Sequence, residues 1–109
     1  MDESLSKTYK TSRGFKYKYY VAPPQGGKPT VFFAHGFPST ANSWHKQASF
    51  FREQGYGIFV PDLLGFGGTD KPTDTEPYLL KLIVGDLMEV IESEGFTKLV
   101  AIGHDWYEV

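Results

Sequence analysis

The sequence predicts an α/β domain whose sheet begins with antiparallel strands and continues with parallel strands joined by crossover helices. From Thr30 onwards, continuous apolar runs alternate with segments of helical periodicity. Buried strands that alternate with helices form parallel sheets with right-handed crossovers. Over 15–22, residues expected to be buried alternate with residues expected to be exposed, which is typical of a half-buried antiparallel strand.

The composition is that of one globular domain. The chain has 109 residues, 40% of them apolar, and a net charge of −2, which gives no electrostatic reason to expect nucleic acid or an anionic membrane as a partner. The absence of cysteine excludes disulfides and cysteine-based zinc sites. No apolar run approaches the about 20 residues of a membrane span, and the polar start is unlike a secretory signal. We therefore predict a soluble, cytoplasmic protein without a cofactor, a metal, or a nucleic-acid or membrane partner.

The N-terminal part is expected to form two short strands around a turn. Residues 1–6 are polar and are expected to lie outside regular structure. Strands are predicted over 9–11 and 15–22, with a turn at 12–14 between them. In the second strand the period of two predicts one buried and one exposed set of side chains. The buried set is Phe15, Tyr17, Tyr19 and Val21, and the exposed set is Lys16, Lys18 and Tyr20.

Three apolar runs are predicted to form buried parallel strands, over 30–34, 57–62 and 98–102. A helix is predicted from Trp44 to about Gln54, capped by Asn42 or Ser43 and ended by Gly55. A loop rich in glycine and proline covers 63–77. The second helix, over 78–94, has its apolar residues at helical spacing. That apolar face comprises Leu80, Ile83, Val84, Leu87, Val90 and Ile91, whereas Lys81, Asp86, Glu89 and Glu92 are expected to point elsewhere.

Reactive residues follow each of the three parallel strands. His35-Gly36-Phe37-Pro38, Asp62-Leu63-Leu64-Gly65 and His104-Asp105-Trp106 come directly after apolar runs. In such sheets the working groups lie beyond the carboxyl ends of the strands. The three segments are therefore expected at one rim.

Asp105 lies where a strand-to-helix turn is expected to expose one reactive side chain. A carboxylate there is a covalent nucleophile in one interpretation, because it can form an ester that divides a hard displacement into two easier steps. In the other interpretation it is a loop residue that caps the following helix. The pattern around Asp105 alone leaves both open.

The His35-Gly36-Phe37-Pro38 turn can direct a backbone N–H at the neighbourhood of that nucleophile. We predict that the N–H groups of Phe37 and Trp106 form an oxyanion hole. His35 itself is expected to pack and hydrogen-bond, since it lies at the base of the loop. The glycines of Gly65-Phe66-Gly67-Gly68 lack phosphate-loop spacing and are better explained by positive φ angles. His45 and His104 have no partners at metal-ligand spacing, so no metal site is predicted.

Together these motifs resemble the α/β-hydrolase fold and, within it, the epoxide hydrolases. The resemblance rests on three signatures in register: His35 to Pro38 followed by Trp44, Pro61 to Gly67 followed by Thr69-Asp70-Lys71-Pro72, and Gly103 to Trp106. Serine esterases are disfavoured by Asp105. Haloalkane dehalogenases, which commonly carry Asn where Phe37 stands, remain an alternative. A non-catalytic half-fold that serves as an interaction module is a second alternative.

The resemblance implies a mechanism. Asp105 opens a small apolar epoxide, and an acid-oriented histidine activates water to hydrolyse the ester to a vicinal diol. The N–H groups of Phe37 and Trp106 hold the oxyanion. The residues around them, His35, Gly36, Pro38 and His104, are implied to contact the substrate.

The chain departs from the family pattern in two ways. Tyr107 stands where the family has a small residue, and no histidine follows His104. The family's lid, its acid and its catalytic histidine would all lie beyond Val109. Residues 1–109 are thus predicted to be a partial α/β-hydrolase domain that ends just after the nucleophile turn. We expect such a chain to be inactive in turnover and poorly soluble, because its last strand lacks a neighbour.

Overall fold

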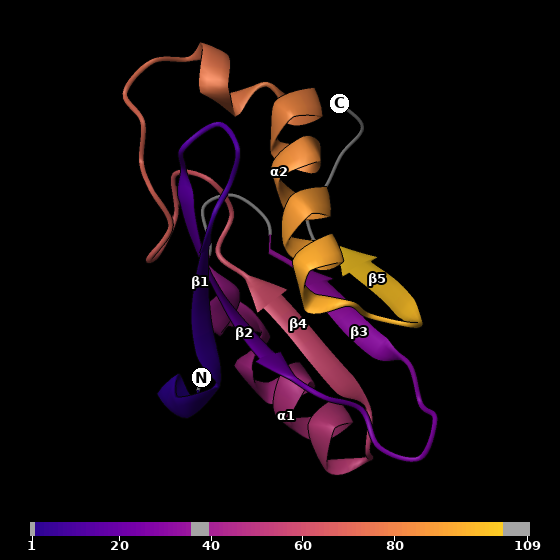
Figure 1. Ribbon diagram of the computed structural model, residues 1–109. Coiled ribbons are helices and arrows are strands. Elements are labelled where there is room, and N and C mark those ends of the chain that lie inside the picture. The colour runs from indigo at the N-terminus through magenta and orange to yellow at the C-terminus, as the bar shows by residue number, and fades with distance from the viewer. Residues whose placement is uncertain (1, 36–39, 104–109) are drawn as a thin grey trace.

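The computed structural model describes residues 2–35 and 40–103. Five strands form one sheet in the order β1-β2-β4-β3-β5 (Figure 1). The strands are β1 (Ser6–Lys10), β2 (Lys16–Ala22), β3 (Thr30–Ala34), β4 (Gly57–Pro61) and β5 (Leu99–Gly103). The helices are α1 (His45–Glu53) and α2 (Leu80–Glu94), with short 3₁₀ turns at η1 (Glu3–Leu5), η2 (Ala41–Trp44) and η3 (Glu76–Tyr78).

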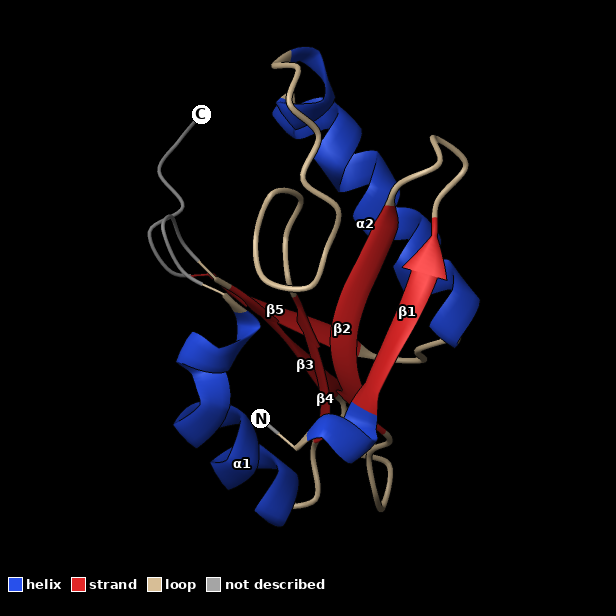
Figure 2. Cartoon of the chain, turned by 90° about the vertical axis from the view of Figure 1, so that its left-hand side faces the viewer, coloured by secondary structure: helices blue, strands red, loops and turns tan. Residues whose placement is uncertain are grey.

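The pairing of the strands confirms the predicted fold class. β1 pairs with β2 and β2 with β4 in antiparallel fashion, whereas β3 pairs in parallel with both β4 and β5. The crossover helices α1 and α2 lie on opposite sides of the sheet (Figure 2). Each β-α-β connection therefore covers one face, as expected for parallel strands buried on both faces.

Two apolar layers enclose the central strands. On the α1 side, Phe33, Ile58 and Val60 pack with Ala48 of the helix. On the α2 side, Phe59 packs with Tyr19 and Val90. β3 and β4 have side chains in both layers, and every residue of β4 is buried. These two strands are thus the centre of the fold, as their apolar runs predicted.

The prediction for β2 is wrong on one point, because Tyr20 is buried instead of exposed. It has 6% of its surface accessible and packs in the α1 layer. Leu5 of η1 packs against this layer, and the Glu3 carboxylate accepts a hydrogen bond from the Tyr20 hydroxyl. The N-terminal turn therefore covers the face that alternation alone assigned to solvent.

Asp86 is a second correction, since it was expected to point away from the packed side of α2. Its side chain is 1% exposed and accepts hydrogen bonds from Arg13 Nε at 3.0 Å and Tyr17 Oη at 2.6 Å. Burial, and then the hydrogen bond to Asp86, raises the pKa of the Tyr17 phenol, so Tyr17 remains a donor. This buried carboxylate is stabilised by an ion pair with Arg13 and a hydrogen bond from the Tyr17 phenol, which lie 73 and 69 residues away in the sequence.

Element boundaries differ from the predictions by a few residues. β1 begins at Ser6 instead of Tyr9. A 3₁₀ turn precedes each helix, so α1 begins at His45 and α2 at Leu80, and neither helix has a side-chain cap at its N-terminus. Gly95, with φ +68°, ends α2 as predicted.

β5 was predicted to be covered on both faces, but it is the least buried strand of the parallel set. Val100 is 51% exposed, and Leu99 and Ile102 are only partly buried. The strand pairs with β3 on one side, and its other edge has no strand among the described residues. The poor solubility that we expect from this strand stays a prediction.

Candidate active site

The three predicted motifs begin at one rim of the sheet because β3, β4 and β5 are parallel. Ala34 pairs in register with Gly103, so the carboxyl ends of β3 and β5 lie side by side, and His35 comes directly after the end of β3. Phe32 pairs with Phe59, which brings the end of β4 to the same rim on the other side of β3. Gly36, Phe37, Pro38, His104, Asp105 and Trp106 lie outside the described residues, and their roles stay predictions.

His35 is buried at the base of this rim. It is 1% exposed, and its Nε2 accepts a hydrogen bond from the Leu63 N–H at 3.0 Å. Its ring and that of Phe66 meet edge to face, with their centroids 5.2 Å apart. A nitrogen that accepts carries no proton, so this contact requires the proton to lie on Nδ1 of a neutral ring. The expectation that His35 packs and hydrogen-bonds is confirmed, whereas its contact with a substrate stays a prediction.

Asp62, directly after β4, links two loops of the rim. Its Oδ1 accepts from the Ala41 N–H at 2.7 Å, and its Oδ2 accepts from the Gly68 N–H at 3.1 Å. The residue is 4% exposed. The sequence motif includes Asp62 but predicts no role for it, because periodicity and spacing do not show that the N–H groups of Ala41 and Gly68 lie beside its carboxylate.

The loop 62–70 is held by its own backbone. Phe66 donates to the Leu63 carbonyl and Thr69 to the Phe66 carbonyl, at 2.9 and 3.1 Å. Gly65 and Gly67 have φ angles of +90° and +55°, as predicted from the glycine pattern, whereas Gly68 is not among the glycines with positive φ. A Cβ at Gly67 would lie 2.3 Å from Asp62 Oδ2, so the carboxylate occupies the space that a side chain would need.

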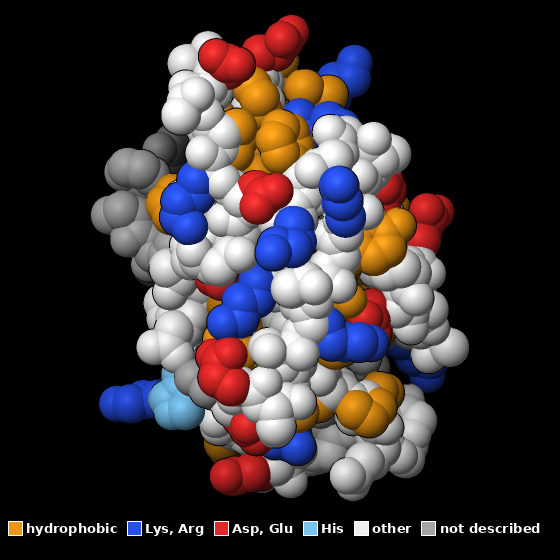
Figure 3. All heavy atoms as spheres, turned by 60° about the vertical axis from the view of Figure 1, so that its left-hand side comes forward, with side chains coloured by type: hydrophobic (Ala, Val, Ile, Leu, Met, Phe, Trp, Pro, Cys, Tyr) orange, Lys and Arg blue, Asp and Glu red, His pale blue; other side chains and the backbone are white. Residues whose placement is uncertain are grey.

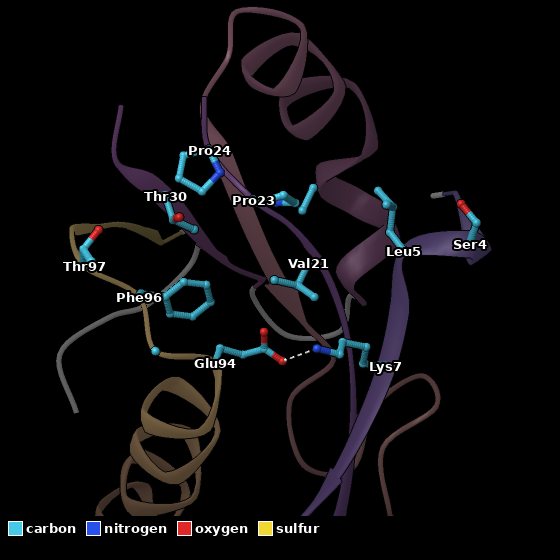
Figure 4. A pocket seen from close by; sticks show the side chains of 12 residues that line it. Ser4, Leu5, Lys7, Val21, Pro23, Pro24, Thr30, Glu94, Phe96 and Thr97 are labelled. Carbon is cyan, nitrogen blue, oxygen red and sulfur yellow. Dashed lines mark hydrogen bonds and ion pairs between the residues drawn. The ribbon is translucent and has the colours of Figure 1, made fainter. Parts of the chain in front are cut away.

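Two hollows are lined by residues that the structure describes. One, of about 460 Å³, lies between the β1–β2 hairpin and the C-terminal end of α2, near the Lys7–Glu94 ion pair (Figure 4). Pro24 and Thr30 line it, so it lies at the amino end of β3, opposite the rim. The other, of about 260 Å³, is an apolar groove between α2 and β5 that includes Phe32, Leu87 and Met88 and reaches the rim at Ala34 and Gly103. The larger hollow therefore lies away from the carboxyl ends of β3 and β5, whereas the apolar groove reaches them.

The described ranges contain no group of three or more histidine, aspartate or glutamate side chains arranged to hold a metal ion. Within those same ranges, no helix has both the length and the apolar character needed to cross a membrane.

In the described part of the chain, the carboxyl ends of the parallel strands β3 and β5 adjoin at one rim of the sheet. Residues 29–106 match the family model described as "alpha/beta hydrolase fold". Since this match covers more than half of the chain, the chain belongs to the α/β-hydrolase-fold family.

Within that family, the chain is similar to epoxide hydrolases. It is 39% identical to Epoxide hydrolase 4 of Mus musculus over 88 residues, which are 81% of this chain and 24% of the relative. It is 42% identical to Epoxide hydrolase 2 of Siraitia grosvenorii over 81 residues, 74% of this chain and 26% of the relative. The crystal structure of an epoxide hydrolase from Vigna radiata aligns with a TM-score of 0.80 at 33% identity, covering 93% of this chain and 32% of that one. The chain thus spans about a quarter of the length of these curated relatives.

Proposed function

We propose that this chain carries the nucleophile part of an epoxide hydrolase, with Asp105 as the residue that opens the epoxide. The observation that carries the proposal is the parallel pairing of Ala34 with Gly103. The segments predicted to contain the reactive groups follow these two residues in the sequence. The similarity to epoxide hydrolases favours an epoxide over a haloalkane as the substrate.

In the proposed reaction an Asp105 carboxylate oxygen attacks an epoxide carbon. A new C–O bond forms, the ring C–O bond breaks, and the ring oxygen takes a proton from a phenol or from water. The product is a 2-hydroxyalkyl ester of Asp105. Water then adds to the ester carbonyl, the N–H groups of Phe37 and Trp106 hold the resulting oxyanion, and cleavage releases a vicinal diol and the free carboxylate.

The second step requires a base to activate water. No histidine follows His104 in the sequence, and the described part of the chain presents His35 as an acceptor from Leu63. We therefore expect residues 1–109 to form the ester and to hydrolyse it very slowly. The cytoplasmic location stays a prediction of the sequence.

Trapping the ester tests this proposal. Incubation of the 109-residue chain with styrene oxide is expected to add one equivalent of the epoxide, which peptide mass spectrometry assigns to Asp105. The Asp105→Asn variant is expected to remain unmodified. Multiple turnovers to diol, or equal labelling of the variant, would contradict the proposal. An unlabelled but cooperatively folded monomer would favour the interaction-module alternative.

A further inference from the structure

We propose that Asp62 is a positioning residue that fixes the segment between His35 and Ala41. This inference rests on the proposed function, in which that segment supplies the Phe37 N–H of the oxyanion hole. The two residues that flank the segment are hydrogen-bonded to two consecutive residues, Asp62 and Leu63. His35 accepts from the Leu63 N–H at 3.0 Å, and the Ala41 N–H donates to Asp62 Oδ1 at 2.7 Å.

The Asp62 carboxylate suits this task because it is buried and accepts from two loops. Its second oxygen accepts from the Gly68 N–H at 3.1 Å, so one rigid group joins the start of η2 to the loop 62–70. Hydrogen bonds to a charged acceptor are roughly twice as strong as neutral ones. Removing a buried acceptor also leaves its donors unsatisfied.

Asp62 is itself fixed to the sheet. Its N–H donates to the Lys18 carbonyl at 2.9 Å, and its own carbonyl accepts from Thr69 Oγ1 at 2.6 Å. The same Thr69 hydroxyl accepts from the Lys18 N–H at 2.9 Å. The backbone of Asp62 is therefore bound to β2, directly and through Thr69.

Such anchoring matters because an oxyanion donor acts only when it is aimed in advance. Catalytic groups must be held within about half an ångström of their working position by supporting contacts. Loss of one oxyanion donor costs roughly 100-fold or more in rate. Asp62 binds the Ala41 end of this segment, and its chain neighbour Leu63 binds the His35 end. Asp62 therefore affects the ester-cleavage step without touching the substrate.

The first test measures the backbone directly and does not need a reaction. Amide exchange and amide chemical shifts are compared by NMR in the unmodified chain, Asp62→Ala and Asp70→Ala. Asp70 is the matched control because its Oδ2 also accepts a backbone N–H, that of Lys16 at 2.8 Å, within the same loop. In Asp62→Ala, the Ala41 amide is expected to exchange at least about tenfold faster, given the strength of a charge-assisted bond, and the Phe37 resonance to move. Asp70→Ala is expected to leave both unchanged.

The second test measures chemistry on the trapped ester. Hydroxylamine adds to the Asp105 ester carbonyl through the same kind of oxyanion, so its rate reports on the oxyanion hole. Cleavage is expected to be slower by about tenfold or more in Asp62→Ala, as for a misaligned oxyanion donor, and unchanged in Asp70→Ala. Asp62→Asn retains one acceptor oxygen and is expected to fall between. It also serves as the informative variant if Asp62→Ala does not fold.

The outcomes separate the two proposals. If the unmodified chain forms no ester, the proposed function fails and the exchange data alone decide the role of Asp62. If the ester forms but is cleaved at the same rate in the Asp62 variants, the positioning role is overturned and the proposed function stands. An unchanged Ala41 amide, or an equal effect of Asp70→Ala, would also overturn it.

Discussion

At the scale of single residues, the rim is organised by a carboxylate and the glycine beside it. Asp62 accepts from two backbone N–H groups, and Gly67 leaves room for that carboxylate. A glycine with positive φ in an open turn needs only its conformational freedom. Gly67 also needs the absence of a Cβ, because the nearest carboxylate atoms lie 2.3–2.6 Å from where that atom would be.

Replacing Gly67 by Ala is therefore expected to destabilise the chain more than the same change at Gly26. The two glycines have nearly equal φ angles, +55° and +57°, but a Cβ at Gly26 would meet nothing within 4 Å. Gly26→Ala is expected to cost about 1–2 kcal/mol for the left-handed backbone alone. Gly67→Ala adds a steric and electrostatic conflict with Asp62, for a total of about 3 kcal/mol or more. Urea unfolding of both variants measures the difference, and equal costs would show that the Asp62 contact is unimportant.

At the scale of elements, the β1–β2 turn holds α2 against the sheet. Arg13 pairs with Asp86 and also donates to the Pro77 carbonyl at 3.2 Å. The neighbouring Ser12 N–H and hydroxyl donate to the Glu89 carboxylate at 2.9 and 2.6 Å. Two acidic residues of one helix thus bind one turn, but only Asp86 does so from a buried position.

This difference in burial predicts unequal effects of substitution. Asp86→Ala is expected to cost about 3 kcal/mol or more, because breaking a buried ion pair leaves Arg13 and the Tyr17 hydroxyl without their acceptor. Glu89→Ala removes exposed hydrogen bonds and is expected to cost about 1 kcal/mol or less. Both changes place alanine in the same helix, so helix propensity is matched. Thermal or urea unfolding compares them, and a Glu89→Ala variant that is as unstable as Asp86→Ala would contradict the argument.

At the scale of the whole molecule, the two edges of the sheet have opposite character. The β1 edge carries exposed Lys7 and Lys10, and Figure 3 shows basic side chains interspersed with acidic ones over a face of the molecule. Lysines on an edge strand discourage pairing with another sheet. β5 has no charged residue, and Val84 and Met88 of α2 are exposed beside it at 46% and 50%. Among the strands that the structure describes, β5 is therefore the edge at which we expect self-association.

A lysine on this second edge is expected to reduce self-association. Val100→Lys places a charge on β5, where Val100 is 51% exposed, so the fold has room for it. Phe50→Lys is the control, because Phe50 of α1 is 58% exposed but belongs to a helix. Analytical ultracentrifugation of equal concentrations is expected to show a larger monomer fraction for Val100→Lys than for Phe50→Lys. Equal fractions would indicate that general surface hydrophobicity, not the open strand edge, drives association.

Several features of this chain follow from local sequence. The apolar runs at 30–34 and 57–61 and the period of α2 depend on neighbours within a few residues. The α/β class, the parallel orientation of the central strands and the positive φ angles of Gly65 and Gly67 could therefore be predicted. The burial of His35 could be predicted as well, because this residue directly follows a buried strand. The positions of Gly36 to Pro38 and of Asp105 remain predictions from motifs.

Only the tertiary structure decided which polar groups lie inside. Asp86 and Tyr20 were placed outside by periodicity, because a pattern along one element cannot show that Arg13 or Glu3 lies opposite it. The same holds for Asp62, whose two donors come from separate loops. Local sequence specifies strands, helices and turns because backbone preferences act over short distances. The burial of a charge depends on partners that only the folded chain brings within hydrogen-bonding distance.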